Sequence, residues 1–299
     1  MKILLLGQNG QVGWELQRSL APLGDLVALD RQGANGLVGD LSDLDGLAAT
    51  VRAVQPQVIV NAAAHTAVDR AESEPELAQR INADAPAVLA REAAAAGALL
   101  VHYSTDYVFD GSGNQPWHED DATSPLGIYG RTKLMGERAI RQATARHLIL
   151  RTSWVYAARG GNFAKTMMRL AQERERLTVI NDQWGAPTGA ELIADVTALA
   201  LRQLHVRPQE AGTYHLAAAG ETTWFEYAKY VLALVKQAQP AIKLVVNDVA
   251  PIATMDYPTP AQRPLNSRLD TRRLRSVFGL RLPQWQEGVQ RMVSEIIQK

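Results

Sequence analysis

The chain contains no cysteine among its 299 residues, which excludes disulfide bonds and metal sites built from thiolates. It also has no excess of charge, because 31 Lys and Arg residues balance 31 Asp and Glu residues. A nucleic-acid-binding domain typically carries a basic surface, so this balance argues against one. No apolar run approaches the roughly 20 residues of a membrane-spanning helix. We therefore expect a soluble, cytoplasmic protein that binds neither nucleic acid nor membrane.

What the sequence does contain is a regular alternation of strand and helix patterns in its first half. Short apolar runs predict the strands, and longer stretches with apolar residues at helical spacing predict the helices. The predicted strands are residues 2–6, 25–30, 58–64, 98–103 and 147–152, and the predicted helices are residues 11–20, 75–97 and 129–143, with another beginning near Leu44. This alternation is typical of an α/β fold with a Rossmann-like, doubly wound parallel sheet.

Beyond residue 156 the alternation becomes less regular. Helices are predicted at residues 162–174, 190–204, 224–236 and 285–297, and strands at residues 177–181, 212–216 and 242–246. We expect residues 157–299 to form mainly a smaller C-terminal, substrate-binding lobe, with parts of this segment returning to the main sheet.

Glycines recur at every third position directly after the first predicted strand, at Gly7, Gly10 and Gly13. Glycine lets the backbone turn tightly and approach a pyrophosphate, and the helix that follows offers free N–H groups to the phosphates. Glycines also occur in ordinary turns, but a strand before them and a helix after them favour phosphate binding. The loop therefore predicts that residues 1–156 form a dinucleotide-binding domain.

Two charged residues follow the second predicted strand, roughly 20 residues after the glycines, where a ribose-binding acid is expected. Asp30 would accept hydrogen bonds from the ribose hydroxyls of NADH, whereas Arg31 would pair with the extra phosphate of NADPH. The choice between NADH and NADPH therefore stays open. Asp40 is interpreted as an adenine-contacting residue or as the N-cap of the helix near Leu44, a position that Ser42 or Asp43 would fill equally well.

Tyr129 and Lys133 lie four residues apart at the start of a predicted helix, so their side chains share one face. A tyrosine with its ordinary pKa of about 10 exchanges its proton slowly near neutrality, and a neighbouring cation would lower that pKa. The spacing also occurs by accident on surface helices. Ser104 and Thr105 end a predicted central strand, where side chains face the ligand crevice of such sheets.

Together these features resemble the extended short-chain dehydrogenases/reductases, and most closely the dTDP-4-dehydrorhamnose reductase family. The resemblance spans nearly the whole chain. It rests on the glycine loop, Asp30, the Tyr129–Lys133 pair and five further blocks: residues 61–69, 103–109, 151–156, 181–188 and 263–264. It implies reduction of the C4 keto group of dTDP-4-dehydro-β-L-rhamnose to dTDP-β-L-rhamnose, the last step of dTDP-rhamnose synthesis, with hydride from NADPH or NADH.

The resemblance also implies a role for individual residues. Tyr129 would donate a proton to the C4 oxygen, Lys133 would lower the Tyr129 pKa and bind the nicotinamide ribose, and Thr105 would hold the carbonyl oxygen. The dTDP-sugar would be contacted by Thr105, Asp106, Trp154 and Arg263. The cofactor would be lined by Gly7, Gly10, Gln11, Val12, Gly13, Asp30, Asp40, Leu41, Ala64, His65, Thr66, Tyr103, Tyr129 and Lys133, with Arg31 added from its position in the sequence. From residue type alone, His65 is interpreted as a packing or hydrogen-bonding histidine.

Some members of this family are described as homodimers joined through Mg²⁺ held by glutamates, and the resemblance places Glu15, Glu191 and Glu295 at the corresponding positions. Oxygen ligands suit Mg²⁺, although this ion usually keeps several waters. The alternative interpretation, three solvated surface glutamates, is the one that the residues favour.

Two other functions are compatible with the same motifs. One is a sugar-nucleotide epimerase or dehydratase of the same superfamily, and the other is a non-catalytic, NADP-binding regulatory subunit, as in methionine adenosyltransferase. The intact Thr105, Tyr129 and Lys133 favour an enzyme. Dehydratases of the superfamily carry a second acid after the aspartate, whereas this chain has Tyr107, a weak base at neutral pH.

Overall fold

The computed structural model describes residues 1–239 and 242–297. Its centre is a six-stranded sheet in the order β10-β5-β4-β3-β1-β2, with all five neighbouring pairs parallel. The strands are β1 (Lys2–Leu6), β2 (Asp25–Leu29), β3 (Val58–Asn61), β4 (Leu99–Thr105), β5 (His147–Thr152) and β10 (Gly212–His215). The predicted doubly wound parallel sheet is confirmed, and its strand order reverses at β1, where the chain proceeds to β2 on one side and to β3 on the other.

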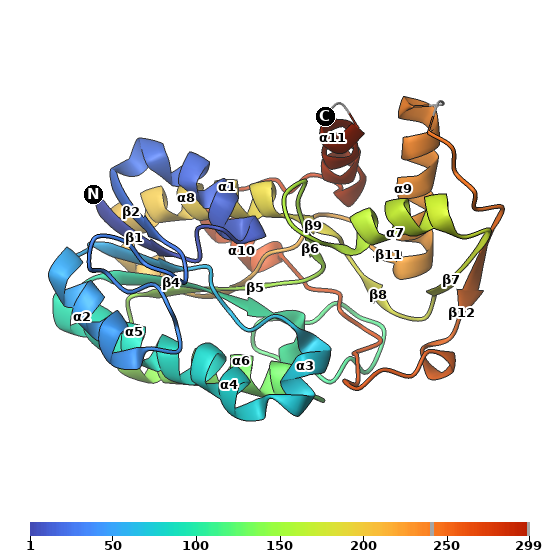
Figure 1. Cartoon of the computed structure of the whole chain (residues 1–299). Helices are drawn as coiled ribbons and strands as arrows, with labels where there is room; N and C mark the ends of the chain where they lie inside the picture. Colours follow the sequence, from blue (N-terminus) through green and yellow to red (C-terminus); the bar gives the residue numbers. More distant parts are fainter. Residues whose placement is uncertain (240–241, 298–299) are drawn as a thin grey trace.

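Helices cover both faces of this sheet (Figure 1). One face carries α1 (Gln11–Leu20), α8 (Ala190–Val206) and α10 (Arg272–Phe278), and the other carries α2 (Leu44–Val54), α5 (Ala85–Ala96) and α6 (Ile128–Ala143). The position of β1 in the sheet explains why its residues 3–6 are all apolar. Ile3 and Leu5 enter the core under α1 and α8, while Leu4 and Leu6 enter the core under α2 and α5. A parallel strand buried on both faces needs such an uninterrupted apolar run.

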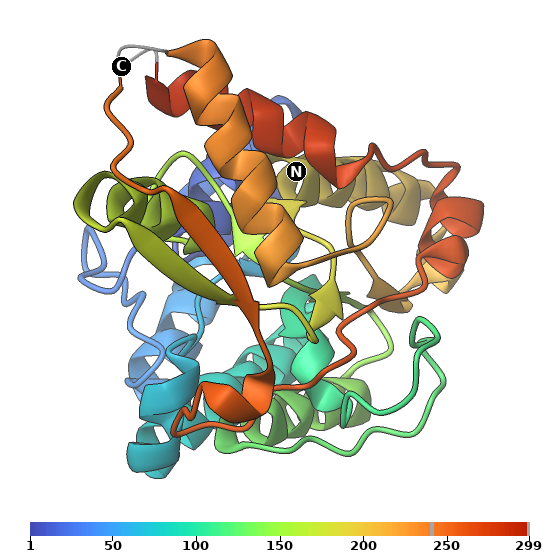
Figure 2. The same ribbon diagram turned by 90° about the vertical axis from the view of Figure 1, so that its right-hand side faces the viewer.

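The smaller lobe lies beyond the carboxyl ends of the sheet strands (Figures 1 and 2). Its helices are α7 (Phe163–Glu173), α9 (Trp224–Ala238) and α11 (Trp285–Ile297), and its largest strand pair is β7 (Arg176–Ile180) with β12 (Asp248–Ile252). Short strands connect it to the main domain: β6 (Val155–Tyr156), β8 (Trp184–Gly185), β9 (Thr188–Gly189) and β11 (Thr222–Thr223). As expected, parts of the later chain return to the sheet, namely α8, β10 and α10. The boundary at residue 156 stays a prediction.

Several predicted elements are corrected by the structure. The prediction of a strand at residues 242–246 is wrong. Ile242, Leu244 and Val246 pack into the lobe's core but belong to no β-strand, and β12 begins at Asp248. The strand predicted to reach residue 64 ends at Asn61. The helix predicted at residues 75–97 consists of α4 (Pro75–Gln79), a π-helical turn (Arg80–Asp84) and α5. Helices α3 (Val68–Ser73) and α10 were not predicted.

None of the helices in the described part of the chain is both long and apolar enough to cross a membrane.

Candidate active site

The glycine loop after β1 is packed so tightly that side chains would not fit. Gly7 has a positive φ of 88°, and a Cβ there would lie 2.8 Å from the Ala63 nitrogen. A Cβ on Gly13 would collide with the Gly7 carbonyl oxygen, so glycine lets α1 approach β1 closely. Among the described residues no side chain caps the N-terminus of α1, which leaves its first N–H groups available to an anion. The loop therefore fits a dinucleotide phosphate.

The charged residues after β2 are linked to one another. Asp30 accepts hydrogen bonds from the Asn9 amide at 2.8 Å and from the Gln32 N–H at 2.9 Å. The Arg31 side chain is 83% exposed and forms an ion pair with Asp40 at 3.1 Å. The Arg31 guanidinium therefore lies exposed at the surface, on the residue that directly follows Asp30.

The alternative role of Asp40 as a helix cap is wrong, because the Asp43 carboxylate caps α2 by accepting from the Gly46 N–H. Asp40 instead accepts from the Ser42 N–H, and its pKa is lowered because hydrogen bonds from Ser42 and Arg31 outweigh the effect of burial. Leu41 belongs to the core under α2.

The segment after β3 is held by a residue that sequence reasoning missed, Asn82 in the π-helical turn. Its amide accepts from the His65 N–H at 2.9 Å and donates to the His65 carbonyl oxygen at 3.0 Å. It also donates to the Thr132 hydroxyl on α6. His65 Nε2 lies 3.2 Å from Glu74, which supports the interpretation of a hydrogen-bonding histidine. Ala64 is half-buried and Thr66 exposed beside it.

The predicted catalytic hydroxyls meet where β4 ends and α6 begins. Thr105 lies within hydrogen-bonding reach of the Tyr129 phenol and donates to Asp106 Oδ1 at 3.0 Å. Burial raises the pKa of Tyr129 to about 12, although the hydrogen bond with Thr105 lowers it. Burial likewise raises the pKa of Asp106 to about 6, against hydrogen bonds with Ser267 and Thr105. Tyr129 is therefore a neutral phenol, able to donate a proton at neutral pH.

Lys133 is 2% exposed and points from α6 to β4. Its ammonium or amine nitrogen lies 2.6 Å from the Tyr103 carbonyl oxygen and 3.1 Å from His102 Nε2. Burial lowers the pKa of Lys133 to about 8, and the charge of Glu137 opposes this. Burial of the phenol dominates the Tyr129 pKa, and the predicted lowering of that pKa by Lys133 stays a prediction.

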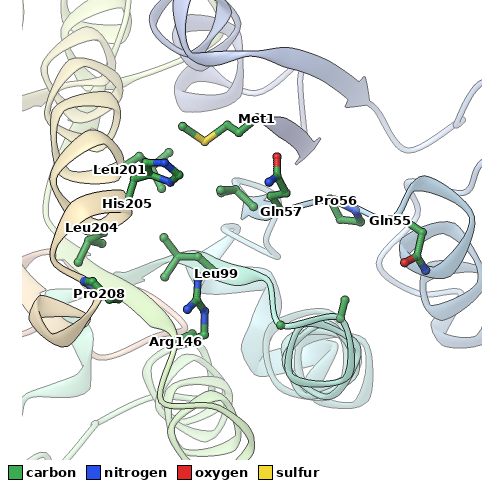
Figure 3. A pocket seen from close by; sticks show the side chains of 13 residues that line it. Met1, Gln55, Pro56, Gln57, Leu99, Arg146, Leu201, Leu204, His205 and Pro208 are labelled. Atoms are coloured by element: carbon green, nitrogen blue, oxygen red, sulfur yellow. The ribbon is translucent and has the colours of Figure 1, made fainter.

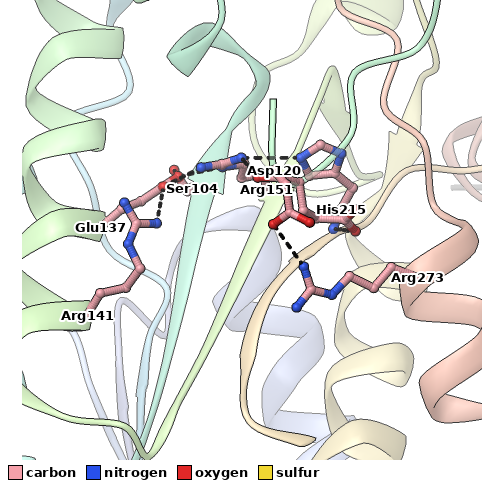
Figure 4. A network of polar contacts seen from close by, with 8 residues as sticks. Ser104, Asp120, Glu137, Arg141, Arg151, His215 and Arg273 are labelled. Carbon is pink, nitrogen blue, oxygen red and sulfur yellow. Dashed lines mark hydrogen bonds and ion pairs between the residues drawn. The ribbon is translucent and has the colours of Figure 1, made fainter. Parts of the chain in front are cut away.

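A buried network anchors α6 to the strand ends (Figure 4). Glu137, one turn after Lys133, accepts from Arg151 at 2.7 and 2.9 Å and from the Ser104 hydroxyl at 2.6 Å. Burial would raise the pKa of Glu137, but its hydrogen bonds and ion pair with Arg151 outweigh burial and lower it. Glu137 also could have been found by sequence reasoning, since it continues the four-residue spacing of Tyr129 and Lys133.

On the lobe side, Trp154 follows β5 with a strained φ of 47°. Its ring stacks on Trp224 with centroids 3.7 Å apart, and a Cβ on Gly185 would lie 2.7 Å from it. Arg263 donates to Asp69 at 2.8 Å, and its charge acts on Tyr107, whose ring meets that of Tyr129 edge-on at 5.6 Å. The structure thus places Trp154 and Arg263 on elements that face the carboxyl edge of the sheet.

A separate cavity of about 360 Å³ lies at the opposite, amino-terminal edge of the sheet (Figure 3). Met1, Gln57, Leu99 and Arg146 are among the residues that line it, and none of the predicted site residues does. Ligands of open α/β sheets bind outside the carboxyl ends of the strands, so this cavity is not the active site.

The three glutamates proposed as Mg²⁺ ligands lie on one surface. Burial raises the pKa of Glu191, Arg291 lowers it, and the carboxylates of Glu15 and Glu295 raise it. Arg291 pairs with Glu191 at 3.3 Å. In residues 1–239 and 242–297, however, no group of three or more His, Asp or Glu side chains is positioned to hold a metal ion. The described residues of one chain therefore do not form a Mg²⁺ site by themselves, and a site shared between two chains stays a prediction.

Comparison with known proteins agrees with this geometry. Residues 1–298 match the family described as the RmlD substrate binding domain. The chain is 57% identical over 296 residues to the dTDP-4-dehydrorhamnose reductase of Escherichia coli strain K12, covering 99% of this chain and 98% of that protein.

Solved structures give the same result. The structure of a dTDP-4-dehydrorhamnose reductase from Clostridium acetobutylicum is similar with a TM-score of 0.88 and 33% identity, covering 100% of both chains. That of the Bacillus anthracis enzyme in complex with NADP gives 0.86 and 34%, covering 98% of this chain and 99% of that one. The chain therefore belongs to the dTDP-4-dehydrorhamnose reductase family of NADP-dependent oxidoreductases.

Proposed function

We propose that the protein reduces the C4 keto group of dTDP-4-dehydro-β-L-rhamnose to give dTDP-β-L-rhamnose, the last step in making this sugar nucleotide. One observation carries the proposal. The hydroxyls of Thr105 and Tyr129 meet at the carboxyl end of β4 in a chain that is similar over its full length to reductases of this substrate. Two hydroxyls side by side suit a carbonyl oxygen that gains a proton.

The glycine loop and the start of α1 would hold the cofactor phosphates, and Asp30 with Arg31 would contact the adenosine ribose of NADH or NADPH. Bound NAD(P)H would supply the hydride that reduces C4. Lys133 would bind the nicotinamide ribose from α6, and Tyr103 and His65 would flank the same part of the cofactor.

Tyr129 would act as the general acid. A pKa raised to about 12 keeps the phenol protonated at neutral pH. It would donate that proton to the C4 oxygen as the hydride arrives, because the alkoxide forming there is a stronger base than a phenolate. The Thr105 hydroxyl would hold the same oxygen and stabilise the negative charge that develops on it. The Thr105 hydroxyl donates to Asp106 in the structure, so it would turn its single O–H from Asp106 to the C4 oxygen when the substrate binds.

The substrate would lie between the sheet and the smaller lobe. Trp154, held in a strained conformation by Trp224 and Gly185, would pack on the sugar, and Asp106 would hydrogen-bond to it. Arg263 would bind the diphosphate, since a guanidinium forms bidentate, charge-assisted hydrogen bonds with phosphate oxygens. A homodimer joined by Mg²⁺ stays a prediction that the donor set of this chain does not support.

The deciding experiment incubates the purified protein with dTDP-4-dehydro-L-rhamnose and NADPH and follows the loss of NADPH absorbance. We expect consumption of the cofactor and formation of dTDP-rhamnose, and a Tyr129→Phe variant should lose this activity. If NADPH persists while binding of both ligands is detected by calorimetry, the chain is a cofactor-binding regulatory subunit and the proposal is wrong.

A further inference from the structure

Lys133 is contacted from the sheet by a histidine that has no assigned role. His102 lies on β4, is 1% exposed, and places its Nε2 atom 3.1 Å from Lys133 Nζ. The Tyr103 carbonyl oxygen is the second acceptor of that nitrogen, at 2.6 Å. Two buried, titratable groups, one of them a proposed catalytic residue, therefore share one short contact.

The protonation of this pair is decided by the neighbour of His102 on β3, Asn61. Asn61 Oδ1 accepts a hydrogen bond from the Ala63 N–H at 3.2 Å. A backbone N–H can only donate, so this contact fixes the amide with its nitrogen turned away from Ala63. That nitrogen, Nδ2, lies 3.2 Å from His102 Nδ1.

The orientation of the Asn61 amide determines which nitrogen of the His102 imidazole carries the proton. Because Asn61 Nδ2 is a donor, His102 Nδ1 must accept, and the proton of the neutral ring must then sit on Nε2. The Nε2–H faces Lys133, where an uncharged amine accepts it with its lone pair. An ammonium has no lone pair, so it would need the other tautomer, with its Nδ1–H directed against the Asn61 NH₂ group.

The remaining groups around Lys133 differ in their effect on its protonation. Glu137 on α6 favours the ammonium, but its carboxylate is already paired with Arg151 of β5 and with Arg141. The Tyr103 phenol is turned to Thr197 of α8 at 2.8 Å. His102 itself is held neutral, because burial first and the charge of Lys133 second lower its pKa.

We propose that His102 and Asn61 are positioning residues for Lys133: they hold its amine against β4 and favour the uncharged amine over the ammonium. The importance of this for turnover rests on the role proposed for Lys133, but the protonation state itself does not. The cluster links the end of β3, next to the glycine loop, to the helix that carries Tyr129.

The first test needs no variant and no catalysis. Protein labelled with ¹⁵N at histidine is titrated by NMR, and the two ring nitrogens of His102 are compared. At a pH above the Lys133 pKa of about 8, we expect the proton on Nε2 and a bare, hydrogen-bonded Nδ1. A proton that stays on Nδ1 at every pH overturns the proposal, whether or not the protein proves to be a reductase.

The second test measures Lys133 directly, with lysine labelled at Cε and the signal assigned through a Lys133→Met variant. Asn61→Asp replaces the donor by an acceptor and should raise the titration midpoint of Lys133 by at least about one pH unit, a tenfold change. The new carboxylate also acts through space, so the comparison is repeated with His102→Phe. If the imidazole transmits the effect, the rise shrinks by at least about half. An equal rise in both backgrounds, or none in the first, refutes the role of His102.

His147→Phe is the matched control for that comparison. His147 is a buried histidine at the start of β5, and its Nδ1 contacts the Thr144 carbonyl oxygen at 2.8 Å. Its substitution should leave the Lys133 midpoint unchanged. If it moved the midpoint as much as His102→Phe, general loosening of the core would explain the data and the proposal would fall.

Discussion

At the scale of single residues, burial has the largest effect on the chemistry of the site. It raises the pKa of both Tyr129 and Asp106 and lowers that of Lys133, so each pKa moves in the direction that favours the uncharged form, and Tyr129 is fully protonated at neutral pH. A neutral phenol is a proton donor, which suits reduction of a ketone. The same shifts give predictions that separate catalysis from stability.

Tyr129→Phe keeps the ring and removes the proton donor. General acids contribute about 10²–10⁴-fold, so kcat should fall by about that factor while the affinity for NADPH changes little. The control is Tyr230→Phe, which removes a phenol from the smaller lobe. A Tyr129→Phe enzyme that retains a third of the wild-type kcat would exclude Tyr129 as the acid.

Asp106→Asn should stabilise the protein at neutral pH. The folded-state pKa of Asp106 is about 6 against an ordinary value of 3.8, so the folded protein binds more protons between these values. Stability from this group is therefore lost as pH rises from about 4 to 6. At roughly 1.4 kcal/mol per pH unit, the asparagine should regain up to about 3 kcal/mol at pH 7.

The measurement is thermal unfolding of both proteins at several pH values between 4 and 8. The difference in Tm should grow with pH and level off above pH 6. A difference that does not vary with pH would show that the Asp106 carboxyl titrates at its ordinary pKa.

Arg31→Ala should change the choice of cofactor. The exposed guanidinium pairs with Asp40, and in the NADPH complex it would pair with the 2′-phosphate. A hydrogen bond to a charged group contributes about 1.5–3 kcal/mol, so the Kd for NADPH should rise at least about tenfold. The Kd for NADH is the internal control, and equal changes in the two constants would contradict the assignment.

At the scale of elements, α6 determines the site because Tyr129, Lys133 and Glu137 all project from one of its faces. The helix is positioned by the π-helical turn Arg80–Asp84, whose Asn82 side chain bonds to Thr132. Gly136 permits this close packing, since a Cβ there would collide with the Asn82 carbonyl oxygen. Turns of this type often occur at functional sites.

Gly136→Ala is therefore expected to destabilise the fold and lower kcat together. Alanine in a helix is ordinarily more stable than glycine by up to about 1 kcal/mol, whereas overpacking costs about 1–3 kcal/mol. The sign of the change in the free energy of unfolding therefore shows which effect is larger. Thermal unfolding measures it. Gly161→Ala, at a position with no atoms within 4 Å of the new Cβ, is the control. A more stable Gly136→Ala protein would show that α6 and the π-helical turn separate without cost.

At the scale of the whole molecule, the smaller lobe faces the carboxyl edge of the sheet, where β4 ends and α6 begins. We expect one NAD(P)H consumed per keto sugar reduced, and no reaction with dTDP-glucose. Tyr107 follows Asp106 where dehydratases carry a second acid, and its raised pKa leaves it unable to act as a base. Product analysis by chromatography tests this, and a 4-keto-6-deoxy sugar formed from dTDP-glucose would overturn it.

The sequence by itself determined the sheet domain and the position of the cofactor loop. Gly7, Gly10 and Gly13 follow a strand, and Tyr129 and Lys133 share a helix face, so these features depend only on local spacing. Family resemblance supplied the substrate. The unpaired run at residues 242–246 was predicted as a strand because apolar periodicity does not reveal whether a partner strand is available.

Only the tertiary structure decided what surrounds the catalytic groups. Asn82 reaches His65 from the π-helical turn, Asn61 and His102 come from neighbouring strands, and burial has the largest effect on the Tyr129 pKa. These contacts join residues that are far apart in the chain, and desolvation depends on everything packed around a group. Neither can be read from the spacing of residues along the sequence, because both arise only when the sheet, the helices and the lobe come together.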